Sequence, residues 1–378
     1  MKIVKKDIGL MWGIFFVYFF VIDAYEALLP LYLKEIGIGA SILGGIVFFA
    51  NLIRILSSVL VAYIGDAKRT IFFTMIILFL SISSLIFFKN GAVIVILSVL
   101  ILSTKSPFNI SANPLLAYSV SSEERGLAFG IRDVFLYAGT SFGLLFSGVL
   151  ISYGFPLIFV CLSVLMSFSF VFISYLSGGA KNSKKNKYES IFSKINKIKE
   201  KKNLFICCVV AFLAAFSSGV MFLIPLKGKS IDISSDFILY SFAGSSIIAA
   251  LLSYVGGKVT DKFNRRKLFL LNLFLSFILY ITIFFSSDLI SFSFSVILIG
   301  ILYVFAPVFP VYFFDLFEQE EGELAWGILA TISLIGEMIA PLLWGVLWDN
   351  FVQNYVFLLS SVIVLVNLVF SVKALPNK

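Results

Sequence analysis

Long apolar stretches separated by short polar segments run along the whole chain. About 20 residues of helix span the hydrocarbon core of a bilayer, and twelve stretches reach that length. We place them at 9–33, 41–64, 70–88, 92–119, 127–151, 155–176, 204–226, 235–257, 267–287, 289–314, 324–348 and 352–373. The pattern predicts an all-α membrane protein with about twelve transmembrane helices. Weak polar breaks leave eleven or thirteen spans as alternatives.

The second half of the chain repeats the first at a constant distance. The segment RGLAFG at 125–130 returns as GELAWG at 322–327, a shift of 197 residues (322 − 125 = 197). A duplicated set of membrane spans is typical of transporters, whose substrate sites lie between the repeats near the middle of the bilayer. We therefore predict two pseudo-symmetric six-helix bundles, 1–177 and 204–378, joined by a basic linker at 178–203. The linker is either an amphipathic helix on the membrane surface or a solvated loop.

Composition and charge also favour a membrane protein. Hydrophobic residues make up 60% of the chain and charged residues 13%, against about 25% charged residues in soluble proteins. The net charge of +8 is carried by the loops, so we expect the lipid bilayer and not a nucleic acid as the partner. Of the Lys and Arg residues assigned to loops, 22 lie on the side of the two termini and 4 on the other. This bias predicts cytoplasmic amino and carboxyl termini in a multi-pass protein of the cell membrane.

The sequence lacks the residue patterns of an enzyme or a metal protein. It contains no histidine, and its three cysteines, Cys161, Cys207 and Cys208, are not spaced as metal ligands. It has no phosphate-binding loop and no nucleophile–base arrangement. We therefore expect no metal, no cofactor and no catalytic residue. Any proton chemistry must use carboxylates.

A loop motif with a glycine, an aspartate and a basic cluster occurs twice. Its residues are Gly257, Asp261, Arg265 and Arg266 after the eighth span, and Asp66, Lys68 and Arg69 in a shorter copy after the second span. With these loops at matching places in a duplicated twelve-span chain, the sequence resembles the major facilitator superfamily.

The resemblance implies a role for these loops and a place for the substrate. By this resemblance, Asp66 and Asp261 act as gate latches that pair with charges on a facing helix in one conformation and release them in the other. The alternative is that the basic residues only enforce topology. The resemblance also implies a central cavity lined chiefly by the first, fourth, seventh and tenth spans, between two bundles that rock around it. A monomer suffices for this mechanism.

Ionisable side chains inside the predicted spans are the strongest candidates for function. Each costs at least ~2.5 kcal/mol at the middle of a bilayer, so each needs an explanation. Asp23 and Glu26 share a face of the first span, and a polar stripe recurs every four residues in the fourth span. The candidate substrate and coupling residues are Asp23, Glu26, Arg54, Lys105, Asn109, Asn113, Glu337 and Tyr303.

We expect Asp23 and Glu26 to form a charge network with Lys105 and Arg54. Protonation of a carboxylate would then break a pair and change the affinity for a small-molecule substrate, which couples transport to H+. The alternative is a fixed ion pair that only locks two helices together. Glu337 is either a second protonation site or a buried structural partner. The segment 336–345 around it is similar to a glycine-and-proline motif of exchangers, or serves close helix packing.

These features predict a secondary active transporter of a small solute that is driven by H+, with sodium as the alternative driving ion. Arg54 and Lys105 favour an anionic or polyhydroxylated substrate, whereas the three carboxylates are compatible with an efflux antiporter for lipophilic cations. A membrane sensor that does not transport and a lipid flippase are further alternatives on the same scaffold.

Overall fold

The computed structural model describes residues 2–64, 66–118, 125–176, 200–305, 308–317, 319–351 and 353–376. Within its helices, the side chains of 2–7, 58–60, 62–64, 114, 117–118, 125–127, 253–262 and 319–324 lie outside the description. The predicted linker, 178–203, is therefore described only from residue 200, and its limits stay a prediction.

Twelve helical segments of the described chain are long and apolar enough to cross a membrane, which confirms the predicted spans. The first half contains α1 (Lys2–Glu35), α2 (Ala40–Ile64), α3 (Ala67–Phe87), α4 (Gly91–Ser103), α5 (Lys105–Tyr118), α6 (Arg125–Leu150) and α7 (Phe155–Tyr175). The second half contains α9 (Lys201–Ser218), η2 (Met221–Leu223), α10 (Ile224–Ser230), α11 (Ser235–Lys262), α12 (Arg265–Phe285), α13 (Leu289–Leu302), η3 (Tyr303–Phe305), α14 (Val308–Phe314), α15 (Gln319–Asn350) and α16 (Tyr355–Ala374).

Spans 4, 7 and 10 are broken, whereas the sequence pattern predicts one helix for each. Pro107 has no N–H to donate to the carbonyl of Ser103, and α4 ends at that residue. Pro225 likewise cannot donate to Met221, where span 7 passes through the 3-10 helix η2. In span 10, the 3-10 helix η3 separates α13 from α14. Interrupted membrane helices are tolerated where they meet partners or a cavity, so these breaks mark a candidate site.

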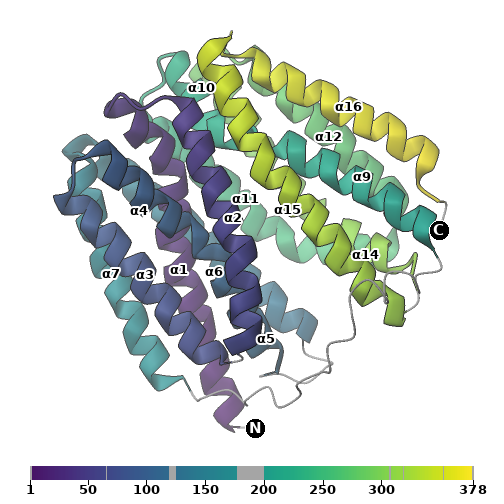
Figure 1. Ribbon diagram of the computed structural model, residues 1–378, viewed down its shortest axis with the longest axis horizontal. Coiled ribbons are helices and arrows are strands. Elements are labelled where there is room, and N and C mark those ends of the chain that lie inside the picture. The colour runs from purple at the N-terminus through teal and green to yellow at the C-terminus, as the bar shows by residue number, and fades with distance from the viewer. Residues whose placement is uncertain are drawn as a thin grey trace.

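The two halves pack through two helix pairs that are related by the sequence repeat. In Figure 1, α2 of the first half lies along α15 of the second, and α6 likewise packs on α11. Glycines permit the close approach: a Cβ on Gly44 would overlap the Pro341 carbonyl oxygen, and one on Gly345 the Ala40 carbonyl oxygen. Gly148 faces α11 at the position equivalent to Gly345 (345 − 148 = 197). The repeat in the sequence is thus also a repeat in packing.

Asp349 ties the halves together at one end of the molecule. It lies near the end of α15, and its carboxylate accepts hydrogen bonds from the N–H groups of Ala40, at 3.1 Å, and Ser41, at 2.7 Å. The Ser41 hydroxyl donates a third bond at 2.6 Å. A carboxylate at a helix N-terminus satisfies free N–H groups and is stabilised by the helix dipole. Asp349 therefore caps α2 across the interface between the halves.

The halves diverge toward the opposite end, where both chain termini lie (Figure 1). Two ion pairs described at that end each stay within one half. Asp66 pairs with Arg69 in the first half, and Arg265 pairs with Asp315 in the second. The halves are thus joined at the end where α2 begins and separated at the end that carries the termini.

Candidate transport site

A cavity of about 480 Å³ lies between the halves. Its walls come from α1, α5 and α6 of the first half and from η2, α10, α11, α13 and η3 of the second. All three broken spans reach it: span 4 through Lys105, span 7 through Met221 and Pro225, and span 10 through Tyr303. The helix breaks therefore lie at the wall of the cavity.

Lys105 is paired with two carboxylates in this cavity. Its ammonium nitrogen lies 2.9 Å from Asp23 Oδ1 and also contacts Glu26 Oε2. The side chains of Lys105 and Asp23 are 17% and 20% exposed, whereas that of Glu26 is 48% exposed. Because Glu26 is accessible although it lines a cavity inside the bundle, water can reach the ion pairs. The structure thus brings together three of the charged residues proposed from the sequence.

Asp23 has a second partner on α6. The Thr140 hydroxyl donates a hydrogen bond to Asp23 Oδ2 at 2.6 Å. The carboxylate therefore uses one oxygen for Lys105 and the other for Thr140. Protonation at the Lys105 side would break the ion pair and leave the Thr140 bond in place, so the carboxyl would keep its orientation.

The position of Lys105 follows from the break in span 4. It is the first residue of α5, directly after Thr104, whose hydroxyl oxygen lies 2.9 Å from the buried Tyr18 hydroxyl. The Tyr18 ring stacks on Phe108, with ring centroids 3.8 Å apart. These contacts fix the start of α5 against α1. Lys105 is thereby held beside Asp23.

The second half contributes hydroxyl and aromatic groups, and no charge, to the described cavity wall. Tyr303 of η3 lies against Tyr137 of α6, with ring centroids 5.3 Å apart. Ser245 and Ser246 of α11 line the wall beside Phe222. A wall of this kind suits a solute that carries both hydroxyl groups and an apolar face.

Arg54 and Glu337 lie outside this cavity wall, in the α2–α15 pair. Arg54 Nη1 donates to Asn51 Oδ1 at 2.7 Å, and the Asn51 amide donates to the main-chain carbonyl of Glu337 at 2.8 Å. No ion pair joins the side chains of Arg54 and Glu337 among the described contacts. Three of the four charges expected in one network thus meet at the cavity wall. Arg54, the fourth, belongs to an Arg54–Asn51–Glu337 cluster that joins the halves.

Asn109 and Asn113 follow Lys105 along α5, but neither lines the described cavity. Asn113 Oδ1 accepts a hydrogen bond from Arg132 Nη1 at 2.9 Å, and Arg132 also pairs with Asp133. The four-residue spacing does place the polar stripe on one helix. Only its first member reaches the cavity.

Comparison with protein families identifies the chain. The sequence model described as Major Facilitator Superfamily matches residues 11–243 and 204–378. The chain belongs to the Major Facilitator Superfamily. This membership, with the twelve apolar helices, makes the protein a multi-pass membrane transporter and not an enzyme. A search of curated proteins found no significant match.

Solved structures of transporters share the fold. The nucleoside transporter NupG, crystallised as a mutant, matches with a TM-score of 0.85 and 10% identity over 98% of this chain and 100% of that one. A bacterial homologue of the human lysosomal transporter Spinster, inward-facing and occupied, gives 0.76 and 13% over 98% and 96%. A D-xylose–proton symporter gives 0.75 and 13% over 99% and 98%. At these identities the likeness establishes the fold alone.

The first-half loop motif of this superfamily member is engaged only within its own half, among the described residues. Asp66 caps α3 by accepting the Arg69 N–H at 3.1 Å, and it pairs with the Arg69 side chain at 3.2 Å. Lys68 donates to the main-chain carbonyl of Leu176, just past the end of α7. A latch to the second half would require these contacts to be exchanged for new ones.

The second-half loop motif is only partly described. Arg265 pairs with Asp315 at 2.6 Å, and Arg266 donates to a main-chain carbonyl of α16 at 2.6 Å. The structure does not describe the surroundings of Gly257 or the side chain of Asp261. The latch role assigned to Asp261 therefore stays a prediction.

Sequence reasoning missed the uncharged residues around Lys105 and the Asp349 cap. Thr140 directly follows Gly139, one of the glycines shared by both repeats, and this is the only sequence signal that points to it. Tyr137 and Ser245 carry no comparable signal. Asp349 stands beside Asn350 at the end of a span, so it looks like an ordinary polar boundary.

Proposed function

We infer that the protein is a proton-coupled secondary transporter that moves a small polar solute across the cell membrane by alternating access. The observation that carries this proposal is Lys105, held between Asp23 and Glu26 in a cavity shared by both halves. A charge pair inside a membrane protein is costly to bury and responds to protonation of its carboxylate. Coupling to protons requires a carboxylate inside the membrane whose ion pair breaks when the carboxylate is protonated.

Protonation of Asp23 is the proposed coupling step. A proton on Oδ1 breaks the pair with Lys105, which keeps Glu26 as its counter-ion. The carboxyl then presents an O–H group that a hydroxyl or carbonyl of the solute can accept. Proton binding and solute binding stabilise each other, because the bound proton opens a site that Lys105 otherwise occupies. The proton leaves when Lys105 returns to Asp23 after the solute has dissociated.

The described conformation is inward-facing if both termini are cytoplasmic, as the Lys and Arg distribution predicts. The α2–α15 and α6–α11 pairs then close the outer end, and the halves separate at the cytoplasmic end (Figure 1). Transport requires the reverse arrangement, in which these pairs part. The cytoplasmic loops with Asp66 and Asp261 then come together.

The size and charge of the cavity support a neutral polyhydroxylated solute. Its volume of about 480 Å³ is within the ~300–1,000 Å³ that small-molecule sites occupy. Lys105 has two counter-ions and Arg54 lies outside the wall, so the described cavity offers no unpaired cation to an anionic solute. Two structural relatives are a nucleoside transporter and a D-xylose–proton symporter, which lends support by analogy of fold.

Uptake into proteoliposomes tests this function. We expect an inside-alkaline pH gradient to drive accumulation of a labelled nucleoside or pentose, and a protonophore to abolish it. A gradient of one pH unit supports about tenfold accumulation for one proton per solute. Accumulation that requires sodium and resists the protonophore would assign the coupling to Na+. If neither labelled nucleosides nor labelled pentoses entered the vesicles, the proposed substrate class would be contradicted.

Export of lipophilic cations in exchange for protons is a second candidate. Asp23, Glu26 and Lys105 sum to one negative charge when all are ionised, which favours a cation over an anion. The rings of Tyr137 and Tyr303 also offer aromatic faces. The same vesicles separate the two candidates, because entry of a cation in exchange for protons makes the lumen more alkaline.

Replacing Asp349 by alanine is expected to loosen the closed end. The variant loses three hydrogen bonds to the first turn of α2, and such a charged cap contributes ~1–2 kcal/mol. The ratio of molecules closed at this end to molecules open at this end should therefore fall about fivefold to thirtyfold. Spin labels at Ile36 and Phe351, both exposed and on opposite halves at this end, would report longer distances.

The matched control for this cap is Asn350→Ala. Asn350 is the exposed neighbour and bonds only within its own helix among the described contacts. Its replacement should leave the distances unchanged. A wild-type distance distribution in Asp349→Ala would show that the cap does not hold this end closed.

A further inference from the structure

A second hollow lies in the second half, near the end where the halves are joined. Its volume is about 510 Å³, and it is formed where α10 and α12 end and α16 begins. Lys227 of α10 lines it, with only 1% of its surface exposed. Among the described residues, its ammonium group has no hydrogen bond or ion pair. The side chain is buried, while its ammonium group faces the hollow without a counter-ion, so an anionic oxygen of a ligand is expected there.

The same hollow contains two oxygen acceptors, one of which lacks a donor. Asn354 lines it, and its buried side-chain oxygen Oδ1 has no hydrogen-bond donor among the described residues. Asp232 supplies a carboxylate to the hollow. The hollow therefore presents one cation and two oxygen acceptors. A ligand that fits it carries both an anionic oxygen and N–H or O–H donors.

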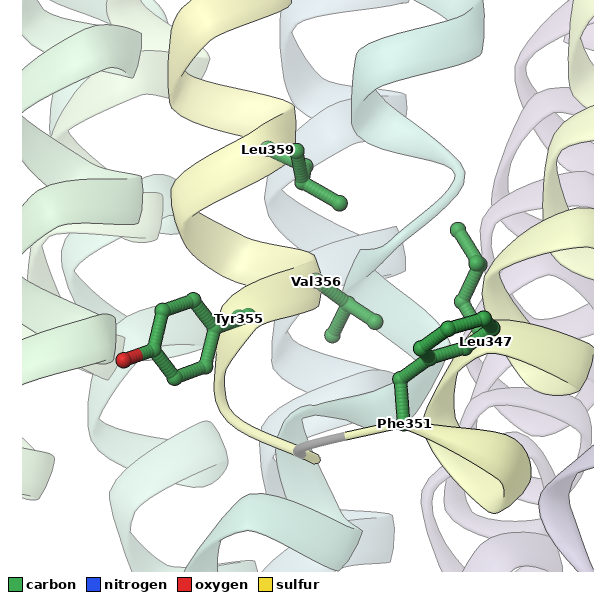
Figure 2. Close-up of a pocket in the computed structure, with 5 residues that line it drawn as sticks. All are labelled: Leu347, Phe351, Tyr355, Val356 and Leu359. Carbon is green, nitrogen blue, oxygen red and sulfur yellow. The ribbon is translucent and has the colours of Figure 1, made fainter.

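An apolar groove adjoins this hollow and shares Tyr355 with it. The groove has a volume of about 340 Å³ and is lined by Leu347, Phe351, Tyr355, Val356 and Leu359. Figure 2 shows Val356 directed toward Leu347 and Phe351, with the Tyr355 hydroxyl directed away from them. The two spaces together are polar at one end and apolar at the other. Their occupant is therefore expected to be amphipathic.

Both spaces lie at the ends of the membrane spans. Phe285 and Tyr355 beside them are 70% and 51% exposed. Tyr355 packs edge-on against Phe284, with ring centroids 5.5 Å apart. Exposed aromatic rings at helix ends are typical of the membrane–water interface, which is the depth of lipid headgroups.

We propose that the paired spaces bind one phospholipid, with its phosphate on Lys227 and an acyl chain in the apolar groove. Charge complementarity supports the position of the phosphate, since the phosphate supplies the counter-ion that Lys227 lacks. The apolar groove favours a phospholipid over a free anion, because a free anion has no acyl chain to fill the groove. The lipid joins α10, α12 and α16 at the closed end. The site does not depend on the identity of the transported solute.

Asp232 and Asn354 select phosphatidylethanolamine among the phospholipids. Its primary ammonium group donates hydrogen bonds to both acceptors while its phosphate pairs with Lys227. Phosphatidylcholine has a quaternary ammonium group without N–H donors. Phosphatidylglycerol carries a net negative charge beside the Asp232 carboxylate. We therefore expect phosphatidylethanolamine to bind more tightly than phosphatidylcholine or phosphatidylglycerol.

Thermal unfolding of the full-length protein in lipid-free detergent tests this site with short-chain phosphatidylethanolamine as the probe. The lipid is expected to raise the midpoint of wild type, and Lys227→Met should need at least about tenfold more lipid for the same rise. Lys229→Met is the matched control, because Lys229 lies on the same helix but lines a different hollow. Without lipid, Lys227→Met should be no less stable than wild type, since it removes an uncompensated buried cation.

Asp232→Asn provides an independent test of headgroup selection. Asp232 has a φ of 60°, which asparagine tolerates as well as aspartate. This variant should lose the preference for phosphatidylethanolamine over phosphatidylglycerol. A wild-type response of Lys227→Met would overturn the proposal. Equal stabilisation by inorganic phosphate would reduce the site to one for a free anion, and equal stabilisation by phosphatidylcholine would overturn headgroup recognition.

Discussion

Asp23→Asn is expected to abolish concentrative uptake while solute exchange continues. Asparagine has the shape of aspartate, and its side-chain oxygen can still accept the Thr140 hydrogen bond of 2.6 Å. It cannot titrate, and Lys105 keeps Glu26 as its counter-ion. The accumulation supported by one pH unit, about tenfold, should therefore fall to about one. Tracer uptake under an imposed pH gradient, and tracer counterflow without a gradient, measure the two activities.

Glu26→Gln is the matched control for this substitution. Glu26 also contacts Lys105, but it is 48% exposed, and the structure describes no bond that orients its second oxygen. Its loss leaves the Asp23–Lys105 pair intact, so accumulation should persist. Undiminished accumulation by Asp23→Asn would contradict the coupling role. Loss of accumulation by Glu26→Gln alone would move that role to Glu26.

Gly44→Ala is expected to lower transport by at least about fivefold, because it hinders closure of the end where the halves are joined. The added Cβ would overlap the main-chain carbonyl oxygen of Pro341, and a backbone atom cannot move aside without shifting α15 against α2. Shifts that relieve such overlap cost ~1–3 kcal/mol, and every transport cycle passes through the closed form. Initial rates of tracer exchange measure the effect.

Gly45→Ala is the control on the next residue of the same helix. A Cβ on Gly45 would meet nothing within 4 Å, so this variant should transport like wild type. Spin labels at Ile36 and Phe351 should report a wider separation in Gly44→Ala and not in Gly45→Ala. Equal rates and equal distances in the two variants would show that the close approach at Gly44 is not required for transport.

The membrane spans could be predicted because length and apolarity alone decide whether a helix crosses a bilayer. The breaks in spans 4 and 7 were also accessible from the sequence, since a proline removes the bond to the carbonyl four residues earlier. Pro107 accounts for the end of α4 at Ser103, and Pro225 for the 3-10 helix η2 that begins at Met221. Hydrophobicity shows where each span lies, but it carries no information on breaks within a span.

The pairing of polar residues between helices could be predicted only in part. Periodicity places Lys105, Asn109 and Asn113 on one face of a helix, but it does not fix how that helix is rotated against the cavity. Arg54 was expected in the charge network of Lys105, and Glu337 was expected as a second protonation site or a buried structural partner. Their separate cluster depends on the packing of α2 along α15, which is a tertiary property.

The roles of uncharged residues and of the capping residue could not be predicted from the sequence, for a different physical reason. A hydroxyl such as that of Thr140 can satisfy itself within a helix, so its presence in a span needs no special explanation. Asp349 follows the local rule for a helix cap, but the helix that it caps begins 309 positions earlier, at Ala40. A sequence pattern that is read locally cannot find such a partner.

Lumen pH in proteoliposomes loaded with a pH-sensitive dye is the most direct measurement of proton coupling at Asp23. The solute that the protein accumulates would be added without an imposed gradient and without sodium. Acidification of the lumen is predicted for wild type, and no pH change is predicted for Asp23→Asn, although tracer exchange continues. Entry of the solute into wild-type vesicles without any pH change would contradict the proposal that the Asp23–Lys105 pair couples transport to protons.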